Sequence, residues 1–336
     1  MTAEPSALDW LPGDLAPVAL RLARADELQY ELAQLCLEWS RNAVEFEQVR
    51  NPRGLLDAVV SSVRPPPPAI MMLISEAVNH LRAAIDNVVF YLVEQARGGA
   101  LPPEHAHHVA MPIQQSADGL ANWVNRRVKH VPELGTGTML HTRIESLQPY
   151  RSLAVVTAVS AQLAALMGAT ELHGVHPLLL LQGYSNADKH RTIRPVVCRS
   201  VVTRSDQSFF GQNREMRPIA VGDVLAADVP QGQRVMLEAQ TAIHIQRPDS
   251  QVWVGPGAEL SQIHGFVADV LIPSLVTGGP VTSPLPRRVD LGDSAATVEE
   301  RIRAGGAESA QDRAGREAWE MVQNDTTPPQ VLAMPD

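Results

Sequence analysis

The chain has 336 residues, of which 45% are hydrophobic and 19% charged, and its formal net charge is -9 at pH 7. That length allows about two domains of roughly 150 residues each, and the composition is typical of a soluble globular protein with a sizeable core. The acidic balance argues against bulk binding to nucleic acid or to an anionic membrane. The most apolar uncharged stretch, 152–170, carries Thr157, Ser160 and Gln162 among its alanines. It predicts a buried helix, and we expect no membrane segment.

The cysteines and the first residues bear on the compartment. Cys36 and Cys198 stand far apart and in no CxxC pattern, which predicts reduced thiols and no disulfide framework. Residues 1–16 contain no basic region followed by an apolar run, so we expect a flexible leader and no secretory signal. Together these features predict a cytoplasmic protein.

Residues 17–191 predict a helical bundle, because apolar residues recur there at steps of three and four. The clearest helix covers 69–97, where a continuous apolar stripe ends at Gly98. Residues 55–63 are expected to form a short strand inside this region. The helices are expected at 17–49, 69–97, 118–129, 138–147, 152–170 and from Pro177 toward Arg191.

The pattern changes from helical to β after Pro195. Alternate apolar residues between Val235 and Ile245 predict a half-buried strand. We expect a β-rich subdomain over 192–276, with a small antiparallel sheet and a closing helix at 258–272 that packs on the bundle. Residues 277–336 predict a disordered tail, with a short helix around 298–322 that forms alone or on a partner. The fold class is therefore α+β.

Four motifs follow one another in a distinctive order. Residues 65–93 read PPPPAIMMLISEAVNHLRAAIDNVVFYLV, and MPI at 111–113, QPY at 148–150 and SNADKHR at 185–191 come later. In this combination the chain resembles an uncharacterised bacterial protein family, in which a proline-rich lead-in precedes a helix of the form HNLRxALDxxVY. The His-Asn order of that family is reversed here as Asn79-His80. The family has no assigned function, so the resemblance implies an architecture and candidate residues rather than a reaction.

Polar groups on two predicted helices form the candidate site. Arg82 and Asp86 are one helical turn apart on a flank of the apolar stripe, where an i, i+4 pair can bond. The segment Asp188–Arg191 ends the helix that begins at Pro177, whose leucines are apolar on every side. If the two helices pack, Arg82 and Asp86 can meet Asp188, His190 or Arg191.

Two hypotheses follow from this cluster. In the first, the chain is a non-enzymatic interaction or scaffold module: the charges fix helix packing, and the tail or a sheet edge recruits a protein partner. In the second, it is an enzyme or phosphate-ligand binder in which His190 acts as acid or base, oriented by Asp86 or Asp188. Anionic substrate would then be held by Arg82, Asn186, Lys189 and Arg191. We favour the first hypothesis, which predicts a closed and fully paired cluster.

Other motifs are weaker. A helical-bundle ribonuclease of the HEPN type carries an Arg followed by a His about five to seven residues later, and no such pair occurs here. Residues 104–108, EHAHH, suggest metal ligands, but they follow two prolines, and a di-iron bundle needs a second ExxH copy. We therefore expect a solvated loop, no metal and no cofactor. Aromatic residues are only 4%, so nucleic acid is disfavoured as a partner, whereas a homodimer stays open.

Overall fold

The computed structural model describes residues 8–160, 162, 164–165, 171–190, 193, 195–208, 217–229, 235–324 and 331–332. The helices in chain order are α1 (Ala16–Ser40), α2 (Ala69–Arg97), α3 (Ala117–Asn125), α4 (Met139–Ser146), α6 (Pro177–His190), α7 (Pro256–Gly265), α8 (Ile272–Thr277), α9 (Val298–Arg303) and α10 (Ala310–Asn324). The strands are β1 (Val44–Arg50), β2 (Leu56–Val63), β3 (Pro195–Arg204), β4 (Arg217–Pro218), β5 (Val224–Val229), β6 (Val235–Gln246), β7 (Trp253–Val254) and β8 (Val331–Leu332).

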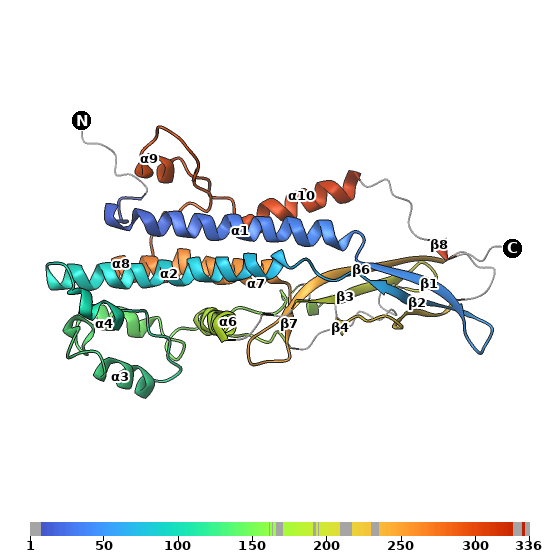
Figure 1. Cartoon of the computed structure of the whole chain (residues 1–336), viewed down its shortest axis with the longest axis horizontal. Coiled ribbons are helices and arrows are strands. Elements are labelled where there is room, and N and C mark those ends of the chain that lie inside the picture. Colours follow the sequence, from blue (N-terminus) through green and yellow to red (C-terminus); the bar gives the residue numbers. More distant parts are fainter. Residues whose placement is uncertain are drawn as a thin grey trace.

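The long helices α1 and α2 form the axis of an elongated molecule. They lie side by side, the α7–α8 segment runs along α2, and α10 lies on the outer side of α1 (Figure 1). The apolar stripe of α2 is wholly buried at Ile74, Val78, Leu81, Ile85 and Val88. Each such side chain contributes about 1.5–3 kcal/mol when it leaves water. Gly98 ends α2 with a left-handed φ of 75°, as predicted for a glycine after the last helical residue.

Two antiparallel sheets stand at one end of the helices (Figure 1). One has the strand order β1-β2-β5, and the other has the order β4-β3-β6-β7, with β8 paired to β6. The predicted α+β class, with a helical bundle, an antiparallel sheet and a closing helix, is confirmed. The predicted strand at 55–63 is also present, as β2.

The predicted helix over 17–49 is wrong beyond Ser40. The segment 44–49 belongs to β1, where Val44 and Phe46 are partly buried and Glu45 between them is exposed. This alternation has the period of a strand, and the hairpin with β2 satisfies the backbone groups of both strands. β2 also pairs with β5. The β1–β2 hairpin therefore shares one sheet with a strand that comes much later in the chain.

The predictions of a helix over 152–170 and of a flexible leader over 1–16 also need correction. The segment 152–160 is not helical, and Val156 instead forms an isolated bridge to Val175; most of 161–170 lies outside the described residues. In the predicted leader, residues 8–15 pack on the core, and the Trp10 indole N–H donates to the carbonyl oxygen of Ser283 at 2.9 Å. Residues 1–7 are not described. The leader packs because its apolar side chains are buried, which its composition alone does not show.

The closing helix is longer than predicted. It runs from Pro256 to Thr277 with a π-helical stretch at Phe266–Leu271, just before Pro273, which has no N–H to continue the regular ladder. Among the described helices, this one alone is long and apolar enough to cross a membrane. Ile263 and Leu271 are fully buried in the protein, and a core helix has the same composition.

The structure also corrects the extent of the predicted tail. Residues from 278 to 324 are ordered on the bundle: Leu285, Val289 and Ile302 are buried, and α9 and α10 both contact α1. The helix predicted around 298–322 is thus present as two helices docked on the same chain. The prediction for 325–330 and 333–336 falls outside the residues that the structure describes.

Candidate functional site

Arg82 and Asp86 form the predicted pair, and together they hold the backbone of Met111. Their side chains are 3.2 Å apart, the Arg82 guanidinium donates to the Met111 carbonyl at 2.7 Å, and the Met111 N–H donates to Asp86 Oδ1 at 2.8 Å. The side chains are 22% and 32% exposed. Each therefore has a partner inside the protein, as in a structural clamp.

Gln148 binds the same segment from the other side. Its side chain is fully buried, donates to the carbonyl oxygens of Pro112 and Ile144 at 3.0 Å each, and accepts from the Gln114 N–H at 2.9 Å. A buried amide with three such bonds is costly to replace. The signature helix, the MPI segment and the QPY segment thus meet in one hydrogen-bonded joint, which the sequence had shown only as separate landmarks.

The second half of the predicted constellation lies on α6, which packs against α2. Asn79 donates to Asp188 Oδ2 at 3.4 Å, whereas Asn186 and Lys189 are exposed. The His190 side chain and all of Arg191 lie outside the described residues. Within the part that is described, no hydrogen bond or ion pair joins Arg82 or Asp86 to α6. The roles predicted for His190 and Arg191 stay predictions.

A second polar joint, absent from the sequence predictions, is completely enclosed. The Arg247 guanidinium meets Glu259 at 2.8 and 2.7 Å, and both side chains are 1% exposed. The Tyr184 hydroxyl donates to the same carboxylate at 3.2 Å, and Arg247 also donates to the carbonyl oxygens of His173 and Val156. Burial, followed by the charge of Glu259, raises the pKa of Tyr184. This joint ties α6 and α7 to the end of β6.

A third joint docks the C-terminal segment on α1. Asp26 accepts from the Ala310 N–H at 2.9 Å at the start of α10 and pairs with Arg313 at 3.0 Å. Burial raises the pKa of Asp26, while the bond to Ala310 and the charge of Arg313 lower it. Further along α10, Glu317 accepts from the Tyr30 hydroxyl at 2.7 Å and from Gln34. Polar groups therefore make much of the contact between α1 and α10.

His264 lies beside this joint. Its Nε2 is 2.9 Å from the Leu22 carbonyl oxygen, so Nε2 carries the proton, and Arg287 donates to Nδ1. Burial, followed by the charge of Arg287, lowers the pKa of His264 to about 3. A neutral imidazole with both nitrogens bonded has no free position for proton transfer. The pocket here, of about 350 Å³, is lined by Asp26, Gln29, Ser261, His264, Arg287, Ala307, Ser309, Gln311 and Asp312.

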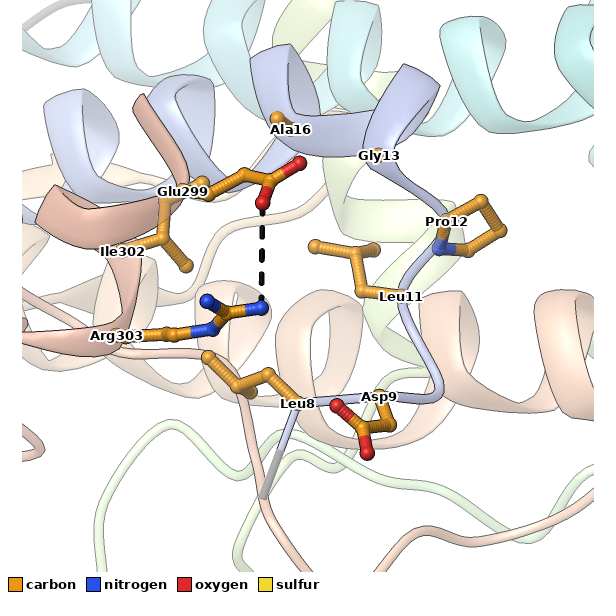
Figure 2. Close-up of a pocket in the computed structure, with 9 residues that line it drawn as sticks. All are labelled: Leu8, Asp9, Leu11, Pro12, Gly13, Ala16, Glu299, Ile302 and Arg303. Carbon is orange, nitrogen blue, oxygen red and sulfur yellow. Dashed lines mark ion pairs between the residues drawn. The ribbon is translucent and has the colours of Figure 1, made fainter. Parts of the chain in front are cut away.

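Another pocket, of about 300 Å³, lies between the N-terminal segment and α9. Figure 2 shows the apolar side chains of Leu8, Leu11 and Ile302 around it, beside an ion pair between Glu299 and Arg303. Both charged side chains are more than half exposed, so the pair is weak. The pocket marks the seam where the N-terminal and C-terminal segments meet.

Four histidines from two segments gather beside α3; we call His105, His107, His108 and His130 the histidine cluster. The expected loop at 104–108 is a 3-10 helical turn, Pro103–His108. The ring of His130 lies 5.1 Å from that of His105 and stacks on that of His108 at 4.3 Å. Burial and neighbouring positive groups hold the pKa values of His108 and His130 below the usual range. The sequence showed the EHAHH run but not the approach of His130.

Comparison with family models, with curated proteins and with solved structures found no match to this chain.

Proposed function

We propose that this chain is a non-enzymatic protein-interaction module that recruits its partner through the outer face of α10. The observation that carries the proposal is Trp319, whose side chain is 63% exposed on that helix. Tryptophan is the residue type most enriched among the few side chains that dominate binding energy at protein interfaces. An indole left in water on an ordered helix offers such an anchor.

The position of α10 supports this role. The helix lies along the outer side of α1 (Figure 1), with Ala310, Arg313 and Ala314 buried toward the protein. Gly315, one turn before Trp319, and Gln323, one turn after it, are exposed, as is Arg316. Trp319 is the one large apolar side chain on this exposed stripe, so it would enter a groove on another protein as a single anchor.

The charges on this face are mixed, because exposed Glu320 lies one turn after exposed Arg316. Arg316 pairs with Glu308, but these side chains are 52% and 41% exposed, so the pair contributes little and can exchange. The matching surface is an apolar groove that takes the indole of Trp319, with a carboxylate on its rim that takes the guanidinium of Arg316. The clamp around Met111 is consistent with the same proposal, because Arg82 and Asp86 are occupied there in a structural contact.

The test compares two variants that each remove one exposed apolar side chain. Trp319→Ser removes the proposed anchor, and Met139→Ser removes an exposed side chain at the start of α4. Both variants should unfold at the wild-type urea concentration. In affinity capture from the source cell extract, a protein retained by the wild type and by Met139→Ser should be lost with Trp319→Ser. Equal capture by all three chains would overturn the proposal.

The second hypothesis, an enzyme or phosphate-ligand binder that uses His190 as acid or base, gains support from no contact within the described residues. Its test is His190→Ala, which should abolish phosphate-ligand binding without loss of fold. We also propose a cytoplasmic location, consistent with free Cys36 and buried Cys198, whose thiol pKa values burial raises to about 12. We further propose that the chain belongs to the uncharacterised bacterial family that its motifs resemble.

A further inference from the structure

The histidine cluster is unusual because its rings have no polar partners among the residues that the structure describes. A histidine normally fixes its tautomer through a hydrogen bond at one ring nitrogen. Among the residues described here, the four rings contact one another but make no hydrogen bond to a protein group. The Nδ1 atom of His105 is shielded from solvent and unpartnered. A buried nitrogen in this state costs free energy unless another species binds it.

The four rings lie close enough together that one ion could be shared once their nitrogens are turned toward it. With Zn–N bonds of about 2.0–2.1 Å, two imidazoles on a tetrahedral ion have their centroids about 5 Å apart. The His105–His130 distance is 5.1 Å, and the two ring planes meet at 60°. His108 lies 4.3 Å from His130 and 6.4 Å from His105, one distance below the tetrahedral value and one above it, so the ring of His108 must turn before it can share an ion with the other two.

The cluster needs a small rearrangement to bind an ion. As the side chains stand, no group of three His, Cys, Asp or Glu residues in the described part of the chain could hold a metal ion. His108 and His130 are stacked nearly parallel, at 10°, an arrangement that bonds neither ring nitrogen. The proposed binding therefore includes a rotation of these side chains between staggered wells.

The backbone on both sides is already held. The 3-10 turn that carries the first three histidines is closed by backbone bonds such as Val109 N–H to Ala106 O at 3.1 Å. Arg97 donates to the carbonyl oxygen of His130 at 3.5 Å and pairs with Glu133 at 2.9 Å. The guanidinium of Arg127 stacks on Trp123 at 4.2 Å, and Lys129 is a second cation close to the ring of His130.

We propose that His105, His108 and His130, with His107 at the open side, bind one divalent transition-metal ion of the zinc type. Imidazole suits Zn²⁺, Ni²⁺ and Cu²⁺ and discriminates against Mg²⁺ and Ca²⁺, which prefer oxygen ligands. The exposed carboxylate of Glu104 or a water completes the coordination. This site is independent of α10 and of the proposed interaction.

The experiment titrates Zn²⁺ into the full chain, purified without a polyhistidine tag, by isothermal calorimetry, with Mg²⁺ as the comparison ion. The expected result is one Zn²⁺ per chain and no binding of Mg²⁺. His130→Asn should weaken Zn²⁺ binding at least about tenfold, as loss of a metal ligand or its support does. The control is His173→Asn, because His173 lies outside the cluster at a φ of 47° that asparagine tolerates, and it should bind like wild type.

X-ray absorption identifies the zinc ligands in the Zn²⁺-loaded wild type. This measurement does not depend on whether the His130→Asn variant folds. Scattering from three or more imidazoles on one zinc supports the proposal. The proposal is overturned if the zinc shows oxygen ligands alone, if the wild type binds no Zn²⁺, or if folded His130→Asn binds as tightly as wild type.

Discussion

Arg313→Met removes the ion pair that docks α10 on α1, together with a bond from Arg313 to the Glu308 carbonyl oxygen at 2.9 Å. Arg313 and Asp26 are 3.0 Å apart, their side chains are 7% and 3% exposed, and 287 residues separate them in the chain, which is the difference between 313 and 26. Methionine keeps an apolar stem against Tyr30, over whose ring the guanidinium now lies at 4.9 Å. The substitution therefore removes the charge while it leaves Asp26 buried beside the Ala310 N–H.

A buried carboxylate that loses its cation costs about 3–5 kcal/mol. Burial already raises the pKa of Asp26 with Arg313 in place, so the environment disfavours the charged form. We expect the free energy of unfolding to fall by about 3 kcal/mol, unless undocking of α10 limits the loss. Urea unfolding followed by circular dichroism measures the loss, and hydrogen exchange over 310–324 shows whether α10 has undocked.

Arg303→Met is the matched control, because its pair with Glu299 is 3.9 Å long and both side chains are more than half exposed. It should change stability by less than about 1 kcal/mol. The double variant Asp26→Asn/Arg313→Met should regain most of the loss, because it leaves no buried charge. A loss from Arg313→Met that matches the control, with α10 still protected from exchange, would refute this account of docking.

Three further predictions concern acid, the C-terminal segment and the clamp. His176 and His264 have pKa values of about 4 and about 3 in the folded chain, against about 6.5 unfolded, so the unfolded chain binds protons that the folded chain does not. The two neutral histidines therefore contribute their full stabilisation above about pH 6.5, and each loses about 3 kcal/mol of it as the pH drops toward 4. In urea unfolding across this range, the free energy of unfolding of His264→Gln should change less steeply with pH than that of the wild type. An equal dependence on pH contradicts the assignment. Deletion of 278–336 should cost several kcal/mol in a thermal or urea melt because it uncovers buried apolar side chains, whereas deletion of 325–336 should cost less than about 1 kcal/mol; equal costs would show that the docked segment adds no stability. Gln148→Leu should lower the free energy of unfolding by about 2–3 kcal/mol, because the Pro112 carbonyl and the Gln114 N–H lose their partner while the Ile144 carbonyl keeps only the Leu147 N–H, and a loss below about 0.5 kcal/mol would contradict the clamp.

Local patterns predicted the local elements well. The helix expected over 69–97 is α2, Ala69–Arg97, because a continuous apolar stripe and a following glycine mark both its face and its end. The pairing of Arg82 with Asp86 was predictable for the same reason, since both lie on one helix face. That they hold the backbone of Met111 was not, because a backbone contact across more than twenty residues leaves no mark in side-chain spacing.

The C-terminal segment was mispredicted for a related reason. Its composition is rich in Pro, Gly and charged residues, which favours disorder, and its buried side chains are few and scattered. It folds because those few, such as Leu285 and Ile302, fit the bundle and because Arg313 meets Asp26. Charge partners so distant in sequence show no periodicity that a sequence analysis can detect. For the same reason, the approach of His130 to the EHAHH segment could not be predicted.

The central claim is that α10 is ordered on α1 and presents Trp319 to a partner protein. The most direct measurement places a photo-crosslinking amino acid at position 319 and, as a control, at the exposed position 139, and irradiates both chains in source cell extract. The account predicts a discrete adduct with another protein from position 319 and none from 139. The same adducts from both positions, or an adduct of 319 only with a second copy of this chain, would contradict it.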